Sequence, residues 1–256
     1  MLKMNFCMRK RPDRSLNEFS NYWREQHGPY AMSGRTARLG MRRYVQNHQV
    51  VTPLAKALAD LVGPATEPFE GVCQLWFDGE DAVLKTRASA DGAAATRDLV
   101  EDERNFLDLP NSAIRFYREE GCVSGVAGSG AHKVVLGVSL KDSRDAILLG
   151  KQVATALESR ADGAGIARAV QNYGLDTPAN EKLREPRGSD RDGFDYMLEL
   201  WFADYASLSA GVVAEGGILA RLVSILCRYS DGGQMAAWIA EERVMIGGEE
   251  PGAAAV

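Results

Sequence analysis

His27 is the residue of this chain best suited to proton chemistry. Its imidazole titrates near neutral pH, and its place in the last turn of a helix that begins after Ser15 favours the protonated ring through the helix dipole. Leu16, Phe19 and Trp23 recur with it at helical spacing, so the ring shares the apolar face of that helix. We therefore predict that His27 is a general acid or base. The alternative is a histidine that only caps the helix by bonding its terminal carbonyls.

Glu199 is a second catalytic candidate, because it is a carboxylate in an otherwise apolar strand. Alternation along residues 72–77 and 197–202 separates a purely apolar row from a mixed row. We expect the mixed row to face an interior space and the apolar row to pack under helices. An unpaired, buried Glu199 would have a raised pKa and could exchange protons. The alternative is an ion pair with an interior arginine, Arg43 or Arg168.

Aromatic and polar side chains near these two residues are candidates for ligand binding. Tryptophans on two strands would form aromatic walls, which suit a flat ligand, and tyrosine hydroxyls would bond to a substrate oxygen. Strand tryptophans such as Trp76 and Trp201 are most often core residues, and the alternative for each tyrosine is a place in the core or at the rim. In the second strand we place Tyr44, Gln46 and His48 on the interior side. The predicted substrate-binding residues are Trp23, Tyr30, Tyr44, Gln46, His48, Gln74, Trp76, Tyr173 and Trp201.

The elements that position these residues follow the order strand, helix, strand, strand, helix, strand within residues 1–120. The run 15–18, Ser-Leu-Asn-Glu, is a capping box that begins the first helix, and Gly28-Pro29 is expected to end it. This βαββαβ order is the ferredoxin-like α+β pattern, with helices on one face of an antiparallel sheet. The remaining strands are expected at 2–8, 42–51, 71–77 and 113–120, and the remaining helices at 54–62, 82–87 and 93–104.

An internal repeat predicts a second, degenerate copy of the unit. Residues 40–77 and 165–202 are identical at 13 of 38 positions without gaps, where composition alone gives about one in fifteen. We predict repeat 1 at 1–120, a Gly/Ser-rich linker at 121–131, repeat 2 at 132–247 and a tail at 248–256. Because each sheet must cover its second apolar face, the two sheets are expected to pack into an intrachain dimeric α/β-barrel around a small-molecule pocket.

Composition excludes several classes of function. The net charge is −5 and no long basic run occurs, so neither nucleic acid nor an anionic membrane is an expected partner. No apolar stretch reaches the ~20 residues of a membrane span, and no signal peptide is recognisable. The four cysteines and three histidines lack metal-ligand spacing, so we expect no metal. A cytoplasmic location is expected, and pairing of two barrels into a homodimer stays open.

Three segments together resemble the EthD domain family of dimeric α+β-barrel proteins. They are residues 22–30 (YWREQHGPY), 42–48 (RRYVQNH) and 74–78 (QLWFD), and the similarity covers most of residues 1–120. The resemblance implies a small-molecule site without a cofactor, in which His27 is the suspected acid or base. Copy two has neither Trp nor His in its first helix region, which implies one principal site.

The resemblance leaves three functions open. One is an acid–base lyase, such as a dehydratase or decarboxylase, or an isomerase, acting on a small aromatic or polycyclic compound. The second is a non-catalytic binding protein that serves an oxidase, and the third is a cofactorless monooxygenase.

Overall fold

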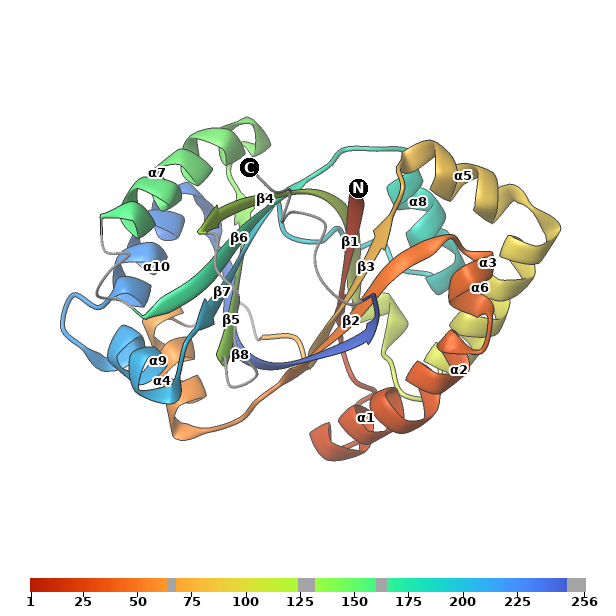
Figure 1. Cartoon of the computed structure of the whole chain (residues 1–256), viewed down its shortest axis with the longest axis horizontal. Helices are drawn as coiled ribbons and strands as arrows, with labels where there is room; N and C mark the ends of the chain where they lie inside the picture. Colours follow the sequence, from red (N-terminus) through yellow and green to blue (C-terminus); the bar gives the residue numbers. More distant parts are fainter. Residues whose placement is uncertain (64–67, 124–131, 160–164, 248–256) are drawn as a thin grey trace.

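The chain forms a closed, antiparallel barrel with helices packed on its outside. The computed structural model describes residues 1–63, 68–123, 132–159 and 165–247. Around the barrel the described strands follow the order β1-β3-β2-β8-β5-β7-β6-β4 (Figure 1). The strands are β1 (Leu2–Met8), β2 (Met41–Gln49), β3 (Gly71–Phe77), β4 (Ala113–Val123), β5 (His132–Leu140), β6 (Ile166–Gly174), β7 (Tyr196–Phe202) and β8 (Ser230–Ile246).

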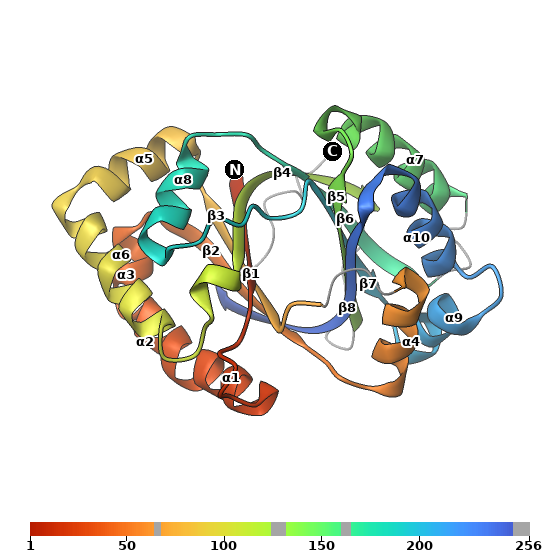
Figure 2. The ribbon, with the colours of Figure 1, turned by 180° about the vertical axis from the view of Figure 1, so that it is seen from behind.

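Helices cover the barrel on two opposite sides, as Figures 1 and 2 show. The first set is α1 (Leu16–Tyr22), the π-helical turn η1 (Trp23–His27), α2 (Gly28–Met32), α3 (Arg35–Arg38), α5 (Glu80–Ala88), α6 (Ala90–Glu103) and α8 (Ala179–Arg184). The second set is α4 (Pro53–Val62), α7 (Ala146–Glu158), α9 (Tyr205–Val213) and α10 (Ile218–Tyr229). The described residues also form the 3₁₀ turns η2 (Leu109–Asn111), η3 (Ser143–Asp145) and η4 (Glu185–Arg187).

Two of these helices, α4 and α8, pack on the side of the barrel that is formed mostly by the other half of the sequence. Helix α4 buries Leu54 and Leu58 in the cluster formed mostly by residues after 132, whereas α8 buries Ala179 and Leu183 in the cluster formed mostly by residues before 120. Figure 1 shows α4 beside α9, and α8 beside α5. Each side of the barrel is therefore completed by a segment from the other half of the chain.

The first helix begins as the sequence predicts but does not end there. The Ser15 hydroxyl accepts from the Glu18 amide and the Glu18 carboxylate accepts from the Ser15 amide, so the capping box is confirmed. The prediction that Gly28 and Pro29 end the helix is wrong. The chain continues through the π-helical turn η1 into α2, with the Gly28 amide bonded to the Trp23 carbonyl. Pro29 is tolerated because it occupies the first turn of α2, where its missing N–H is not needed.

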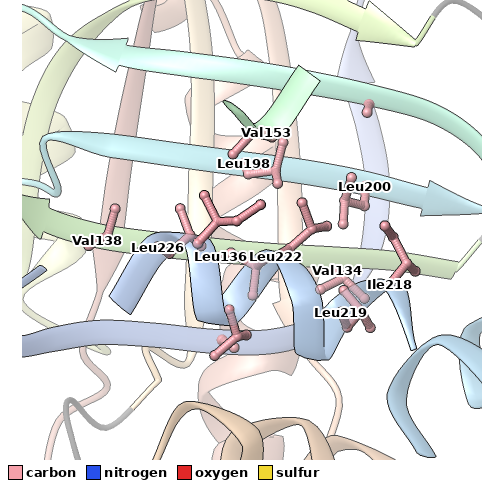
Figure 3. Packing of buried hydrophobic residues seen from close by; sticks show 14 of the residues in the cluster. Val134, Leu136, Val138, Val153, Leu198, Leu200, Ile218, Leu219, Leu222 and Leu226 are labelled. Atoms are coloured by element: carbon pink, nitrogen blue, oxygen red, sulfur yellow. The ribbon is translucent and has the colours of Figure 1, made fainter. Parts of the chain in front are cut away.

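The alternation of β3 and β7 assigns their faces as predicted. Leu75 and Phe77 pack under the helices of the first side, and Leu200 and Phe202 under those of the second. Figure 3 shows the second side, where Leu219, Leu222 and Leu226 of α10 pack on Leu136, Leu198 and Leu200 of the sheet. The opposite rows, with Gln74, Trp76, Glu199 and Trp201, face the barrel interior.

The predicted orientation of β2 is wrong. Tyr44 pairs with Leu75 and Gln46 with Cys73 in neighbouring strands, and residues directly opposite each other lie on the same face of a sheet. Tyr44, Gln46 and His48 therefore face the helices rather than the barrel interior. Polar residues stand at both odd and even positions of β2. Its sequence pattern therefore cannot show which face of the strand points into the barrel.

Side chains of the described residues occupy two parts of the barrel interior, where a ligand pocket was predicted. An apolar cluster built around Val72, Tyr117, Met197 and Trp238 occupies one part of it. A charged cluster centred on Glu199, described below, occupies another.

Strand β4 extends to Val123, so the first three residues of the predicted linker are strand. The rest of the linker and the predicted tail lie outside the described residues. Across the described residues, no single helix has the length and apolar content to cross a membrane. Helices α9 and α10 have that length and apolar content only when taken together, and they are bent by 52° relative to each other.

Candidate active site

A cavity of about 40 Å³ lies between the sheet and the helices of the first side. At roughly 10–15 Å³ for each molecule it has room for about three waters, so a ring-sized ligand requires the surrounding helices to move outward. Its wall is apolar where β1, α2 and β3 meet and polar where α5, α6 and η4 meet. The lining residues are Met4, Phe6, His27, Ala31, Leu39, Met41, Tyr44, Cys73, Leu75, Arg87, Thr96, Leu99, Glu103 and Arg187.

His27 borders this cavity and is held by a carboxylate. Its Nδ1 lies 2.7 Å from Oδ2 of Asp102 on α6, and the Tyr22 hydroxyl donates to Oδ1 of the same carboxylate at 2.9 Å. Burial tends to raise the pKa of Asp102, but the hydrogen bonds and charge of His27 and Tyr22 outweigh it and lower that pKa. Since Nδ1 is committed to Asp102, Nε2 is the ring nitrogen available to a ligand. This is the arrangement of an oriented general base.

The helix geometry places His27 at this point. A π-helical turn inserts one extra residue into a helix and occurs frequently at functional sites; here it ends at His27. The following Gly28 approaches β2 and β8 so closely that an added Cβ would lie 3.0 Å from Nε2 of Gln46 and 2.9 Å from Cε of Met245. A side chain at this position would therefore have to displace the ends of the Gln46 and Met245 side chains.

Tyr44 lines the cavity at the end of a hydrogen-bond chain. Its hydroxyl accepts from Nε1 of Trp23 at 3.0 Å and from Nε2 of Gln46 at 2.7 Å. Both contacts are with N–H donors, so the hydroxyl proton stays available for an acceptor in the cavity. Burial raises the pKa of Tyr44 well above its ordinary value, which keeps that proton in place.

His48 determines which way the hydrogen bond between Gln46 and Tyr44 runs. Its Nε2 lies 3.0 Å from Oε1 of Gln46 and its Nδ1 lies 2.8 Å from the Ser20 hydroxyl. Burial, with help from Arg243 and Arg24, lowers the pKa of His48 to about 3, so the ring is neutral near pH 7. A neutral ring that donates to Gln46 and accepts from Ser20 leaves the Gln46 amide free to donate to Tyr44. His48 thus orients Tyr44 through Gln46 and does not border the cavity itself.

Opposite His27, buried charged residues form the polar end of the cavity. Nη2 of Arg187 lies 2.6 Å from Oε1 of Glu103, and both side chains are buried. Arg87 adds a second cation, and its Nη1 donates to the Thr96 hydroxyl at 3.3 Å. Burial and the nearby Arg187 lower the pKa of Arg87 to about 10, with Glu103 opposing them. This end of the cavity therefore carries two positive charges and one negative charge.

Glu199, the second predicted catalytic residue, lies inside the barrel and away from this cavity. Its carboxylate is 2.5 Å from Nζ of Lys3 and 2.6 Å from Nζ of Lys133, and it accepts from the amides of Asn172 at 2.8 Å and Gln74 at 2.9 Å. Burial alone would raise the pKa of Glu199, but Lys133 and Lys3 outweigh it and hold that pKa well below its usual range. The ion-pair alternative therefore describes this carboxylate, but its partners are lysines rather than the arginines considered.

The predicted binding residues fall into four places. Tyr44 lines the cavity, while Trp23, Gln46 and His48 support it from behind. Tyr30 packs under the Arg35 guanidinium, 3.5 Å away. Gln74, Trp76 and Trp201 belong to the barrel interior around Glu199. Tyr173 lies on the second side of the barrel, where its hydroxyl donates to Gln171.

Sequence reasoning missed Asp102, Glu103, Arg87 and Arg187. One signal was available for the two carboxylates. Both helices of a ferredoxin-like unit lie on one sheet face, so an acidic residue on the second helix can meet a histidine on the first. No comparable signal existed for Arg187, because it reaches the cavity through the crossing of α8.

Fold and site together define an α+β-barrel protein with a histidine–aspartate pair at a small, partly charged cavity. Residues 11–110 match the family model of the EthD domain, which confirms the resemblance seen in the sequence. The match includes His27, Tyr44, Asp102 and Glu103, but not Arg187. No curated protein matches the sequence. Within the described residues, no group of three metal-type ligands gathers.

Solved structures share the fold at low identity. An anthrone oxidase-like protein is 10% identical, with 100% of this chain and 96% of that chain covered and a TM-score of 0.56. A proposed monooxygenase from Fusobacterium nucleatum is 8% identical, with 95% and 92% covered and a TM-score of 0.52. Another from Lactobacillus acidophilus NCFM is 11% identical, with 95% and 94% covered and a TM-score of 0.49. At these identities the likeness concerns the fold alone.

Proposed function

We propose that this protein is a small-molecule enzyme in which His27 transfers a proton and Tyr44 stabilises the oxygen that gains charge. The observation that carries the proposal is the 2.7 Å contact of His27 with Asp102 at the edge of the cavity. The carboxylate orients the imidazole, as a general base requires. A buried tyrosine with a free hydroxyl proton supplies the complementary donor.

The resulting reaction is an acid–base lyase or isomerase reaction on a small aromatic compound. Nε2 of His27 removes a proton from a carbon next to a carbonyl, and the Tyr44 hydroxyl donates to the oxygen that becomes an enolate. Return of the proton to another carbon gives an isomer, and its delivery to a departing hydroxyl gives water and a dehydrated product. The apolar wall suits a ring, and the small volume favours a single ring over a polycyclic compound.

Deuterium exchange tests proton transfer without knowledge of the natural substrate. The protein is incubated in D₂O with small aryl ketones, such as phenylacetone and 4-hydroxyphenylacetone, and loss of the methylene signal is followed by proton NMR. We expect exchange faster than in buffer, and a loss of about 10²–10⁴-fold in His27→Gln. Exchange at the buffer rate, or exchange that His27→Gln retains, argues for the non-catalytic binding function.

Oxidation is the second candidate, favoured by the names of two similar structures, the anthrone oxidase-like protein and the monooxygenase-like protein from Fusobacterium nucleatum. A cofactorless oxygenation begins with the same step, removal of a proton from an electron-rich phenol, so the same His27 would serve it. The difference is measurable, because oxygenation consumes O₂ and proton transfer does not. An oxygen electrode with small diphenols as substrates separates the two functions.

We also propose that the two halves are copies of one unit, 1–120 and 132–247, whose sheets form the barrel. The strand order β4-β1-β3-β2 of the first half has its counterpart in β8-β5-β7-β6 of the second, which supports the proposal. Gly40 and Gly165 occupy equivalent positions and both have positive φ, 68° and 63°. The second half has no histidine at the place of His27, and its helix-facing side is packed with aliphatic chains (Figure 3), which supports a single site.

A further inference from the structure

The polar end of the cavity contains buried polar atoms that have no hydrogen-bond partner among the described residues. Oε2 of Glu103 and Nε of Arg187 are buried and have no hydrogen-bond partner, although both residues are paired through their other atoms. Buried polar atoms in proteins are almost always hydrogen-bonded, and an exception calls for an explanation such as a ligand. Both residues line the cavity, so a ligand there can bond to both atoms.

The charges at this end select the ligand. Arg87 and Arg187 contribute two positive charges against one negative charge from Glu103. Among the other titratable lining residues, burial raises the pKa values of Tyr44 and Cys73, so both are uncharged near neutral pH. His27 is paired with the Asp102 carboxylate at the opposite end of the cavity. A single positive charge in a nearly closed cavity favours a ligand with one negative charge, because little water is present to screen it.

Arg187 reaches this position because of the crossing of α8. It follows α8 in the turn η4, and its Nη1 donates to the Leu183 carbonyl at 3.0 Å. Its guanidinium lies 5.1 Å from the Phe6 ring centroid and is paired with Glu103, so the group is held between the sheet and α6. A planar guanidinium held in this way is suited to binding an anionic oxygen with defined direction.

We infer that the cavity binds its ligand through an acidic oxygen in ionised form, a phenolate, an enolate or a carboxylate on a single ring, held by Arg187 and Arg87. Arg187, contributed by the second half of the chain, is then a specificity-determining residue of the site in the first half. Glu103 positions Arg187 and accepts a hydrogen bond from a second hydroxyl of the ligand. This inference rests on the proposed function in one respect, because it concerns the same cavity that His27 borders.

4-Nitrophenol tests the inference, because its ionised form is yellow and its neutral form is not. Visible absorbance is recorded as the protein is titrated with the probe, about one pH unit below the pKa of the free phenol. We expect the bound probe to be mainly ionised, which corresponds to at least tenfold tighter binding of the anion. Nitrobenzene, which has the same ring without the hydroxyl, is expected to bind at least tenfold more weakly in a competition assay.

Two variants separate charge selection from general damage to the cavity. Arg87→Met is expected to weaken binding of the anion about tenfold, whereas Glu103→Gln, with the same shape but one negative charge fewer, is expected to tighten it. If the substitutions made the cavity collapse, both variants would bind the anion more weakly. Equal binding of nitrobenzene, absence of the yellow form, or weaker binding in Glu103→Gln overturns the inference.

His27→Gln distinguishes this inference from the proposed function. If the inference is correct, that variant still binds the yellow anion even though deuterium exchange is lost. If the wild-type protein binds the anion but exchanges no deuterium, the proposed function fails and the inference stands. If the wild-type protein exchanges deuterium but binds only the neutral probe, the proposed function stands and the inference fails.

Discussion

Replacement of Glu199 by glutamine tests whether the barrel interior depends on a single shared carboxylate. Glu199 lies between Lys3 and Lys133, all three side chains being about 1% exposed. Breaking a buried ion pair costs about 3–5 kcal/mol, because the remaining charge stays buried. Lys3 keeps Glu119 at 2.6 Å and Lys133 keeps Glu242 at 2.7 Å. We therefore expect the lower end, a loss of about 3 kcal/mol in the free energy of unfolding.

The same substitution has a defined pH dependence. The folded-state pKa of Glu199 lies below its ordinary 4.5, so the carboxylate contributes its full stability above about pH 4.5. As the pH falls further, the unfolded chain gains a proton that the folded chain does not bind, and the contribution is progressively lost. The stability difference between wild type and Glu199→Gln should thus be constant from pH 5 to 8 and shrink below about pH 4.5.

Urea denaturation followed by tryptophan fluorescence measures this difference at each pH. Glu215→Gln, a substitution of an exposed glutamate in the same half, is the matched control and should change stability by less than about 0.5 kcal/mol. A Glu199→Gln protein as stable as wild type, or a difference that persists unchanged at pH 3, would refute the reasoning.

Three further substitutions probe the cavity. Asp102→Asn should lower the rate of deuterium exchange about 10²-fold with a small change in stability, since it removes the charge that orients His27; an unchanged exchange rate by NMR contradicts this. Tyr44→Phe leaves the Trp23 and Gln46 donors without their acceptor and should cost about 1–3 kcal/mol, seen as a lower urea midpoint, together with slower exchange. Gly28→Ala should cost about 1–3 kcal/mol by calorimetry, because the added methyl meets Gln46; a neutral effect would mean that the helix can shift.

The sequence by itself determined the elements and much of their packing. Helical spacing of Phe19, Trp23 and His27 set the buried face of the first helix, and the capping box set its start. Strict alternation in β3 and β7 fixed which side of each strand meets helices, because one row is wholly apolar. The EthD resemblance followed from local runs of sequence, and the family match over residues 11–110 confirms it.

Only the tertiary structure decided where the site lies and what composes it. The strand β2 has polar residues on both faces, so its orientation depended on pairing with β3, which turned Tyr44 toward the helices. Glu199 became an ion-paired interior group rather than an acid, because Lys3 and Lys133 are 130 residues apart in the chain and meet only when the barrel closes. Arg187 enters the cavity for the same reason: helix α8 crosses between the halves, and contacts between distant segments leave no local pattern in the sequence.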